Sequence, residues 1–223
     1  MNEKQLAGEK AAEFVQDGMI VGLGTGSTVY YTIQKIGAMV KQGLKINGVS
    51  TSTHTAELAT SLGIPMLSIN DVDSIDLTID GSDEVDLKLN GIKGGGGALL
   101  FEKIVAFASR KVIWVVGSNK MVQTLGKFPL PVEVMQFGYK HVYKKLNEHG
   151  MNPVLRTVQE NLFTTDSNNY IIDLHLEKID NPKALAIWLN TIPGVVENGL
   201  FIDIANTVIV AKDNSIEIVN KNS

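Results

Sequence analysis

The chain contains no cysteine, so it can form no disulfide, thiolate nucleophile or zinc–thiolate site. No apolar run approaches membrane-spanning length, and the N-terminus, MNEKQLAGEKAAEF, lacks the apolar core of a signal peptide. The formal net charge is −4, with no cluster of basic residues, which argues against nucleic acid as a partner. We therefore expect a cytoplasmic protein that associates with neither membranes nor nucleic acid.

What the sequence does contain is enough apolar material for a core: 44% of its 223 residues are hydrophobic. Apolar strand patterns at 19–23, 46–49, 65–69, 75–79 and 112–116 alternate with helical patterns, the first around Ala7 and Ala11. This alternation predicts an α/β fold, a parallel sheet covered by helices. Ligands of such sheets bind beyond the carboxyl ends of the strands.

Residues 75–103 carry the densest group of side chains suited to chemistry. A short strand is expected to end in an acidic turn, which is followed by a lysine, four glycines and a helical pattern with Leu100, Ile104 and Phe107 on one face. The chemistry-bearing residues are Asp80, Gly81, Ser82, Asp83, Glu84 and Asp86 in the turn, then Lys93, Gly94, Gly95, Gly96 and Gly97, and Glu102 in the helix.

Four consecutive glycines carry an entropic cost that is explained where bare backbone N–H groups must approach a ligand. Directly before a helix, these N–H groups add to the positive end of the helix dipole. Glu102 lies about four residues into that helix, so it can face the same cavity as the loop. The combination indicates proton-transfer chemistry, against the alternative of a flexible surface loop beside a solvated glutamate.

A second glycine-rich loop, Gly22 to Thr28, follows the first predicted strand. It is no dinucleotide fingerprint, because Ser27 replaces the third glycine and no acidic residue ends the next strand, and it is no P-loop. The hydroxyls of Thr25, Ser27 and Thr28 around Gly26, at a helix N-terminus, suit a single phosphate. The alternative is a plain tight turn.

The pattern changes after Lys127-Phe128-Pro129-Leu130-Pro131, whose two prolines we interpret as a stiff crossing between domains. Beyond it, helices at 139–149 and 183–190 and strands at 154–158, 170–176 and 195–201 predict a small α+β unit, and strands at 207–211 and 215–219 are expected to return to the first domain. The predicted domains are therefore 1–127 with 203–223, and 128–202.

Four motifs, GLGTGST, DGSDEVD, KGGGGALLFEK and LGKFPLPVEV, occur in an order and at intervals that resemble the type A ribose-5-phosphate isomerases. The resemblance runs essentially end to end and includes the segment 192–201. Departures are Gly97 and Ser82, where many members have alanine. The resemblance implies a Rossmann-like sheet with helices on both faces, a smaller α+β lid domain, and a homo-oligomer, either dimer or tetramer.

The resemblance also implies interconversion of ribose 5-phosphate and ribulose 5-phosphate through an enediolate, without cofactor or metal. It assigns Glu102 as the base, with Asp80, Asp83 and Lys93 in the same site. The substrate-binding residues it implies are Thr25, Gly26, Ser27, Thr28, Asp80, Gly81, Ser82, Asp83, Lys93, Gly94, Gly95, Gly96 and Lys120.

Three alternatives remain open from the residues. The carboxylates Asp80, Asp83, Glu84 and Asp86 could hold magnesium, although Lys93 supplies much of the positive charge that a metal would. A related enzyme, an amino-sugar-phosphate deaminase or a coenzyme A transferase, would also use such a site. A sugar-phosphate sensor domain would need a DNA-binding module that the chain lacks.

Overall fold

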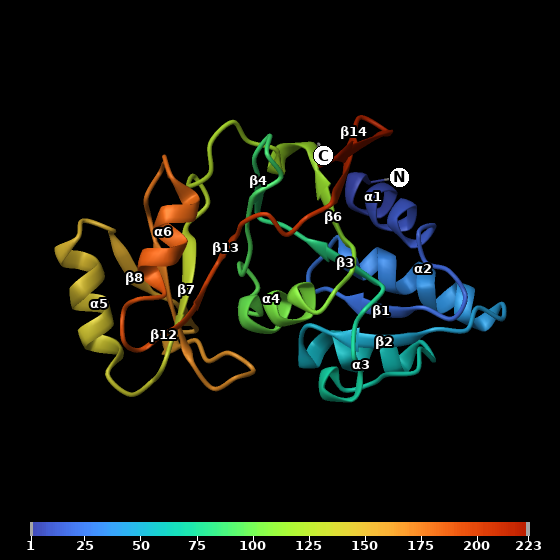
Figure 1. Ribbon diagram of the computed structural model, residues 1–223, viewed down its shortest axis with the longest axis horizontal. Coiled ribbons are helices and arrows are strands. Elements are labelled where there is room, and N and C mark those ends of the chain that lie inside the picture. Colours follow the sequence, from blue (N-terminus) through green and yellow to red (C-terminus); the bar gives the residue numbers. More distant parts are fainter. Residues whose placement is uncertain (1, 222–223) are drawn as a thin grey trace. The chain divides into compact units, whose positions relative to one another are not determined.

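The structure, a computed structural model, describes residues 2–221 and divides them into two units (Figure 1). The first consists of the described residues of Met1–Ser82, Phe101–Met121 and Asp203–Ser223, and the second of Asp83–Leu100 and Val122–Ile202. Compared with the predicted domain limits, the second unit also takes in residues 83–100 and 122–127. Within the described range, no helix combines the length and the apolar character needed to cross a bilayer.

The first unit contains a six-stranded sheet in the order β15-β14-β6-β3-β1-β2. Its strands are β1 (Ile20–Leu23), β2 (Asn47–Ser50), β3 (Leu77–Gly81), β6 (Val112–Gly117), β14 (Thr207–Lys212) and β15 (Ser215–Asn220). All neighbours pair in parallel except β14 and β15. The central strands β3 and β6 are buried except at their last residues, Gly81 and Gly117, as expected where helices cover both faces.

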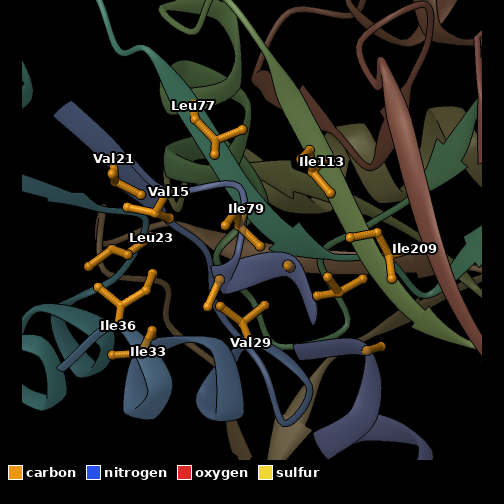
Figure 2. Packing of buried hydrophobic residues seen from close by; sticks show 14 of the residues in the cluster. Val15, Val21, Leu23, Val29, Ile33, Ile36, Leu77, Ile79, Ile113 and Ile209 are labelled. Atoms are coloured by element: carbon orange, nitrogen blue, oxygen red, sulfur yellow. The ribbon is translucent and has the colours of Figure 1, made fainter. Parts of the chain in front are cut away.

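Helices α1 (Glu3–Ala12), α2 (Val29–Lys41) and α3 (Thr53–Ser61) contribute to one core with this sheet. Figure 2 shows Ile33 and Ile36 of α2 close to Leu23 of β1, and Ile79, Ile113 and Ile209 as further members of this core. Val105 of α4 (Leu99–Phe107) belongs to a separate cluster with Val49 and Ile75. Because side chains alternate between the faces of a sheet, the two clusters place helices on both faces, and the predicted Rossmann-like class is confirmed.

The strand order reverses at β1, which has β2 on one side and β3 on the other. Such a switch point is where ligands bind in open parallel sheets, at the carboxyl ends of the strands. The loop 24–28 follows β1, the acidic turn follows β3, and the short helix η2 (Ser118–Lys120) follows β6. The first unit therefore gathers the loop 24–28, the start of the acidic turn up to Ser82, and η2 at one edge of its sheet.

The second unit is built on an antiparallel sheet in the order β12-β7-β11-β8, with two smaller sheets, β13-β5-β4 and β10-β9. Its elements are β4 (Glu84–Val85), β5 (Gly91–Ile92), β7 (Leu130–Val134), α5 (Tyr139–Glu148), β8 (Pro153–Leu155), β9 (Thr157–Val158), β10 (Asn161–Leu162), β11 (Tyr170–Leu174), α6 (Pro182–Leu189), β12 (Val195–Asn198) and β13 (Leu200–Phe201). Leu130, Val132 and Val134 of β7 pack with Val142 of α5 and Leu189 of α6. The residues between them, Pro131 and Glu133, must therefore point to the opposite face.

Three details differ from the sequence prediction. The predicted strand 65–69 is absent; a single bridge joins Gly48 to Met66, and the short helix η1 (Ile69–Asp71) begins at once. The buried side of α4 carries Leu99 and Val105, whereas Ile104 and Phe107, predicted to be on its apolar face, are exposed. The predicted crossing at 127–131 ends inside β7, a central strand that accommodates Pro131. Apolar residue type alone did not distinguish a core face from a surface face here.

Candidate active site

Asp80, near the end of β3, links the acidic turn to the first glycine loop. Its Oδ1 accepts hydrogen bonds from the backbone N–H groups of Thr25, at 3.0 Å, and Gly81, at 2.7 Å. A Cβ at Gly24 would lie 2.1 Å from the same oxygen, so only glycine allows the loop to approach this closely. The carboxylate is buried and aligned by backbone donors on two sides.

The hydroxyl of Thr25 is engaged in a network inside the first unit. Its Oγ1 lies 2.8 Å from the hydroxyl oxygens of Thr51 and Ser52 and 3.2 Å from that of Thr55, which itself donates to the Gly24 carbonyl. These hydrogen bonds fix the loop 24–28 to the segment 51–55, so the Thr25 hydroxyl anchors the loop.

Ser27 is exposed and Thr28 is half-buried, at the start of α2. A cavity of about 390 Å³ adjoins the loop and is lined by Thr25, Gly26, Ser27, Tyr30, Tyr31, Ile33, His54, Thr55 and Leu58. Neither Asp80 nor Glu102 lines this cavity. The loop presents hydroxyl and backbone donors at a helix N-terminus, which is suited to an anion.

Glu102 is the fourth residue of α4 and is only 4% exposed. Val105, three residues on and therefore on the same face, packs against the sheet, where a Cβ at Gly22 would meet it at 2.9 Å. The Ile75 N–H donates to the Ala108 carbonyl, so the C-terminal end of α4 lies at the start of β3. The helix thus returns antiparallel to the strands and points its Glu102 end towards the carboxyl edge.

In the second unit, Asp83 is tied to the four-glycine loop. The Gly95 N–H donates to Asp83 Oδ2 at 2.8 Å, and the Asp83 N–H donates to the Ile92 carbonyl. Lys93 begins the loop and is 2% exposed, with its ammonium 5.3 Å from the centre of the Phe201 ring. A lysine is rarely buried so fully without compensating interactions, so the protein must stabilise this ammonium by contacts such as that with the Phe201 ring.

The two other acidic residues of the turn have structural roles. Glu84 accepts hydrogen bonds from the N–H groups of Gly126 and Phe128, at 2.8 and 2.7 Å. Asp86 accepts from the backbone of Lys88 and Asn90 within its own turn. Both carboxylates are committed to backbone donors, so they do not complete the four-carboxylate magnesium set. Among residues 2–221, no group of three histidine, cysteine or acidic residues is placed to hold a metal ion.

Glu133 is a buried carboxyl group that the sequence analysis did not single out. It lies on the β7 face opposite the helices and accepts from Thr165 Oγ1 at 2.8 Å and Asn169 Nδ2 at 3.0 Å. Burial raises its pKa above the ordinary 4.5; the two hydrogen bonds oppose this shift, and the nearby Glu197 charge adds to it. The N–H of Leu100, in the first turn of α4, also favours its charged form.

The sequence-derived site residues fall into two groups that follow the two units. The first unit holds Thr25, Gly26, Ser27, Thr28, Asp80, Gly81, Ser82, Glu102 and the half-buried Lys120, and the second holds Asp83, Lys93, Gly94, Gly95 and Gly96. The chain passes between the groups at Ser82–Asp83 and at Leu100–Phe101. Arg156, which contacts the glycine loop, was missed because one charged residue in a strand pattern carries no sequence signal.

Comparisons with known proteins find relatives that match nearly the whole chain. Residues 47–215 match the model of the family described as Ribose 5-phosphate isomerase A (phosphoriboisomerase A). The ribose-5-phosphate isomerase A of Lactiplantibacillus plantarum is 56% identical over 97% of this chain and 96% of its own, and that of Listeria innocua is 52% identical over 99% and 100%. A solved D-ribose-5-phosphate isomerase in complex with phospho-erythronic acid is 41% identical, with a TM-score of 0.95 over 99% of this chain and 100% of its own. The Plasmodium falciparum enzyme is 35% identical, with a TM-score of 0.95 over 99% and 98%.

The open, mostly parallel sheet and the nearly full-length match to enzymes of one activity together define the class of protein. It is an aldose–ketose isomerase acting on a sugar phosphate. Within that class, the chain belongs to the type A ribose-5-phosphate isomerase family. It interconverts D-ribose 5-phosphate and D-ribulose 5-phosphate by proton transfer through an enediolate. This activity excludes the deaminase, transferase and sensor alternatives.

Proposed function

We propose that Glu102 is the base that moves the proton between C2 and C1 of the open-chain sugar. Its carboxylate takes the proton from C2 of ribose 5-phosphate, and the electron pair left behind forms the C1–C2 double bond as charge moves to the carbonyl oxygen at C1. The protonated carboxyl then returns the proton to C1, while the C2 hydroxyl loses its proton to the oxygen at C1 and becomes the new carbonyl. The observation that carries this assignment is the burial of Glu102 on the sheet-facing side of a helix.

The enediolate oxygen needs positive charge as it develops, and the second unit offers two sources. Lys93 is a buried cation, and the N–H group of Gly96 lies in the loop before α4, whereas the N–H of Gly95 is already bonded to Asp83. We assign Asp80 and Asp83 to the ring opening and to proton transfer among the sugar oxygens, because carboxylates aligned by backbone N–H groups can exchange hydrogen bonds with hydroxyls.

The phosphate group is assigned to the loop after β1. Ser27 and Thr28 supply hydroxyls, and Gly26 and its neighbours supply backbone N–H groups at the start of α2. Lys120, at the end of the segment after β6, is a further contact for an anion. The complex of a 41% identical relative with phospho-erythronic acid, a phosphorylated acid, supports a site that accepts a phosphate together with a second anionic group.

The proposal also covers the cofactor requirement, the localisation and the oligomeric state of the enzyme. The reaction as written requires no metal or cofactor, since proton transfer and charge stabilisation come from side chains and backbone N–H groups. We propose a cytoplasmic homo-oligomer, a dimer or tetramer.

The assignment of Glu102 is tested by the exchange of the C2 proton of ribose 5-phosphate with deuterium oxide. Glu102→Gln keeps the size of the side chain and removes the proton acceptor. A positioned base contributes roughly 10²–10⁴-fold, so turnover should fall by at least that factor with little change in KM. Exchange at C2 should vanish together with isomerisation.

The control is Glu148→Gln, on the exposed surface of α5, which should leave turnover unchanged. Exchange at a near wild-type rate in Glu102→Gln would move the base to Asp80 or Asp83.

A further inference from the structure

Arg156 is one of only two arginines in the chain and lies between β8 and β9 of the second unit. It interrupts the segment 154–158 that was predicted as one strand. Its backbone stays in place through the Ile171 carbonyl, which accepts the Arg156 N–H, and through the Phe163 N–H, which donates to the Arg156 carbonyl. The side chain is mostly buried, with 15% of its surface exposed. A buried arginine needs partners for its donors, and here they lie on two sides.

One edge of the guanidinium is held by Asp173 of β11. Nε donates to Oδ2 at 2.8 Å and Nη2 donates to Oδ1 at 2.5 Å, a two-pronged pair that fixes the plane of the group. The other nitrogen, Nη1, donates to the carbonyl oxygens of Gly94 at 2.9 Å and Gly95 at 3.1 Å. Asp173 thus orients a cation whose free edge binds the backbone of the four-glycine loop.

These two carbonyls determine where the neighbouring N–H groups point. In a trans peptide, the C=O of one residue and the N–H of the next lie in one plane and point in opposite directions. The Gly94 carbonyl shares its peptide with the Gly95 N–H, which donates to Asp83 Oδ2 at 2.8 Å. One rigid plane therefore connects Arg156 on one side to Asp83 on the other.

The Gly95 carbonyl likewise shares its peptide with the Gly96 N–H, which must point away from Arg156. No atom lies within 4 Å of a Cβ built on Gly96, so the loop is open at this residue. A cation bound to the carbonyl side of a peptide also polarises it, which makes the N–H on the other side a stronger donor. Glycines have no side chains to hold these planes: within the loop the Gly97 N–H donates to the Gly94 carbonyl at 2.9 Å, and the Arg156 guanidinium adds hydrogen bonds from outside the loop to the Gly94 and Gly95 carbonyls.

We propose that Arg156, oriented by Asp173, is the positioning residue of the four-glycine loop, and that it sets the Gly95 N–H on Asp83 and the Gly96 N–H towards the substrate oxygens. This inference rests on the proposed roles of Asp83 and the glycine loop. Arginine suits the task because its planar fork reaches the carboxylate and both carbonyls at once, which the single ammonium of lysine cannot do.

Two conservative variants separate positioning from a mere ion pair. Asp173→Asn removes the charge but leaves the guanidinium and its bonds to the glycine carbonyls. Arg156→Lys keeps a charged partner for Asp173 but loses the fork. If Arg156 positions the loop, kcat should fall more in Arg156→Lys than in Asp173→Asn. If it only pairs with Asp173 to stabilise the unit, the order is reversed, and the proposal is overturned.

Arg156→Ala should lower kcat by about 10–100-fold, since misplacing catalytic groups by about 1 Å costs on the order of 10²-fold. KM for ribose 5-phosphate should stay within about threefold, because the phosphate contacts come from another loop, and millimolar guanidinium chloride should restore part of kcat. Arg110→Ala is the control, as it removes the other arginine and an exposed ion pair with Asp76. Unchanged kcat in Arg156→Ala, or a loss that guanidinium does not restore in the folded variant, would sink the idea.

Asp83→Asn, measured alongside, separates this inference from the proposed function. Wild-type turnover in Asp83→Asn would reject the role of Asp83 itself. Impaired turnover in Asp83→Asn with wild-type turnover in the Arg156 variants would reject only the positioning role. If Arg156→Ala does not fold, the rank order of Arg156→Lys and Asp173→Asn still decides.

Discussion

The backbone N–H of Thr25 donates a 3.0 Å hydrogen bond to Oδ1 of Asp80, 55 residues further along the chain. This bond joins the loop after β1 to the turn after β3, on the two strands that flank the switch point of the sheet. The proposed phosphate loop and the proposed acid–base turn therefore share one anchor. A change at Asp80 should disturb both substrate binding and chemistry, whereas changes at the exposed end of the loop should affect binding alone.

That exposed end provides the first prediction. Ser27→Ala combined with Thr28→Ala removes two hydroxyl donors while leaving the Thr25 network intact. Hydrogen bonds to a charged group contribute about 1.5–3 kcal/mol each, so KM for ribose 5-phosphate should rise at least about tenfold. Turnover of unphosphorylated ribose should change much less. Equal weakening of both sugars would mean that this loop does not bind the phosphate.

Metal removal is the second test. Glu84 and Asp86 are occupied by backbone N–H groups, which leaves Asp80 and Asp83 without the further oxygen ligands that magnesium prefers. We expect turnover to survive exhaustive treatment with EDTA unchanged in a coupled assay for ribulose 5-phosphate. Loss of turnover that added Mg²⁺ restores would reinstate the carboxylate cluster as a metal site.

The third prediction concerns Gly97, the last residue of the four-glycine loop. Its φ is +85°, and a Cβ there would lie 2.4 Å from the ring of Phe163. Gly97→Ala should therefore destabilise the protein by about 1–3 kcal/mol, through ring displacement and backbone strain. Adding Phe163→Leu should recover the part due to the ring. Gly96→Ala, where no atom lies within 4 Å, is the stability control. Unfolding midpoints in urea measure all four proteins, and an unchanged midpoint in Gly97→Ala would contradict the clash.

Glu133 predicts a specific dependence of stability on pH. Its pKa is raised in the folded protein, chiefly by burial, so the folded state binds its proton more tightly than the unfolded chain does. The resulting stabilisation is fully present below the unfolded value of about 4.5 and is lost as pH rises through the higher folded value. Glu133→Gln cannot titrate but keeps an oxygen for Thr165 and Asn169.

Relative to this variant, the wild type should therefore lose stability as pH rises from 4.5. Urea unfolding of both proteins between pH 4.5 and 8 measures the difference. A wild type that gains stability over Glu133→Gln across this range would show that the folded pKa is not raised.

The sequence was sufficient for the architecture of the first unit and for the identity of the family. Strands such as Val112–Val116 are apolar throughout and are punctuated by glycine loops, so both the sheet and the position of its carboxyl ends follow from local pattern. The four motifs identify the enzyme class without knowledge of any tertiary contact. This is possible because binding a given substrate requires particular residue types at fixed intervals. Glu102 was placed correctly in the first turn of its helix for the same local reason.

Tertiary structure alone decided which side of α4 is buried, that a proline lies in a central strand, and that Thr25 is an anchor. Each depends on groups brought together from distant parts of the chain. Arg156 is the clearest case. It is 61 residues from Gly95, and the sequence around Arg156 does not indicate that its side chain contacts a glycine loop. A hydrogen bond between a side chain and a remote carbonyl leaves no periodicity in the sequence, so only the folded chain reveals which cation orients the peptides of that loop.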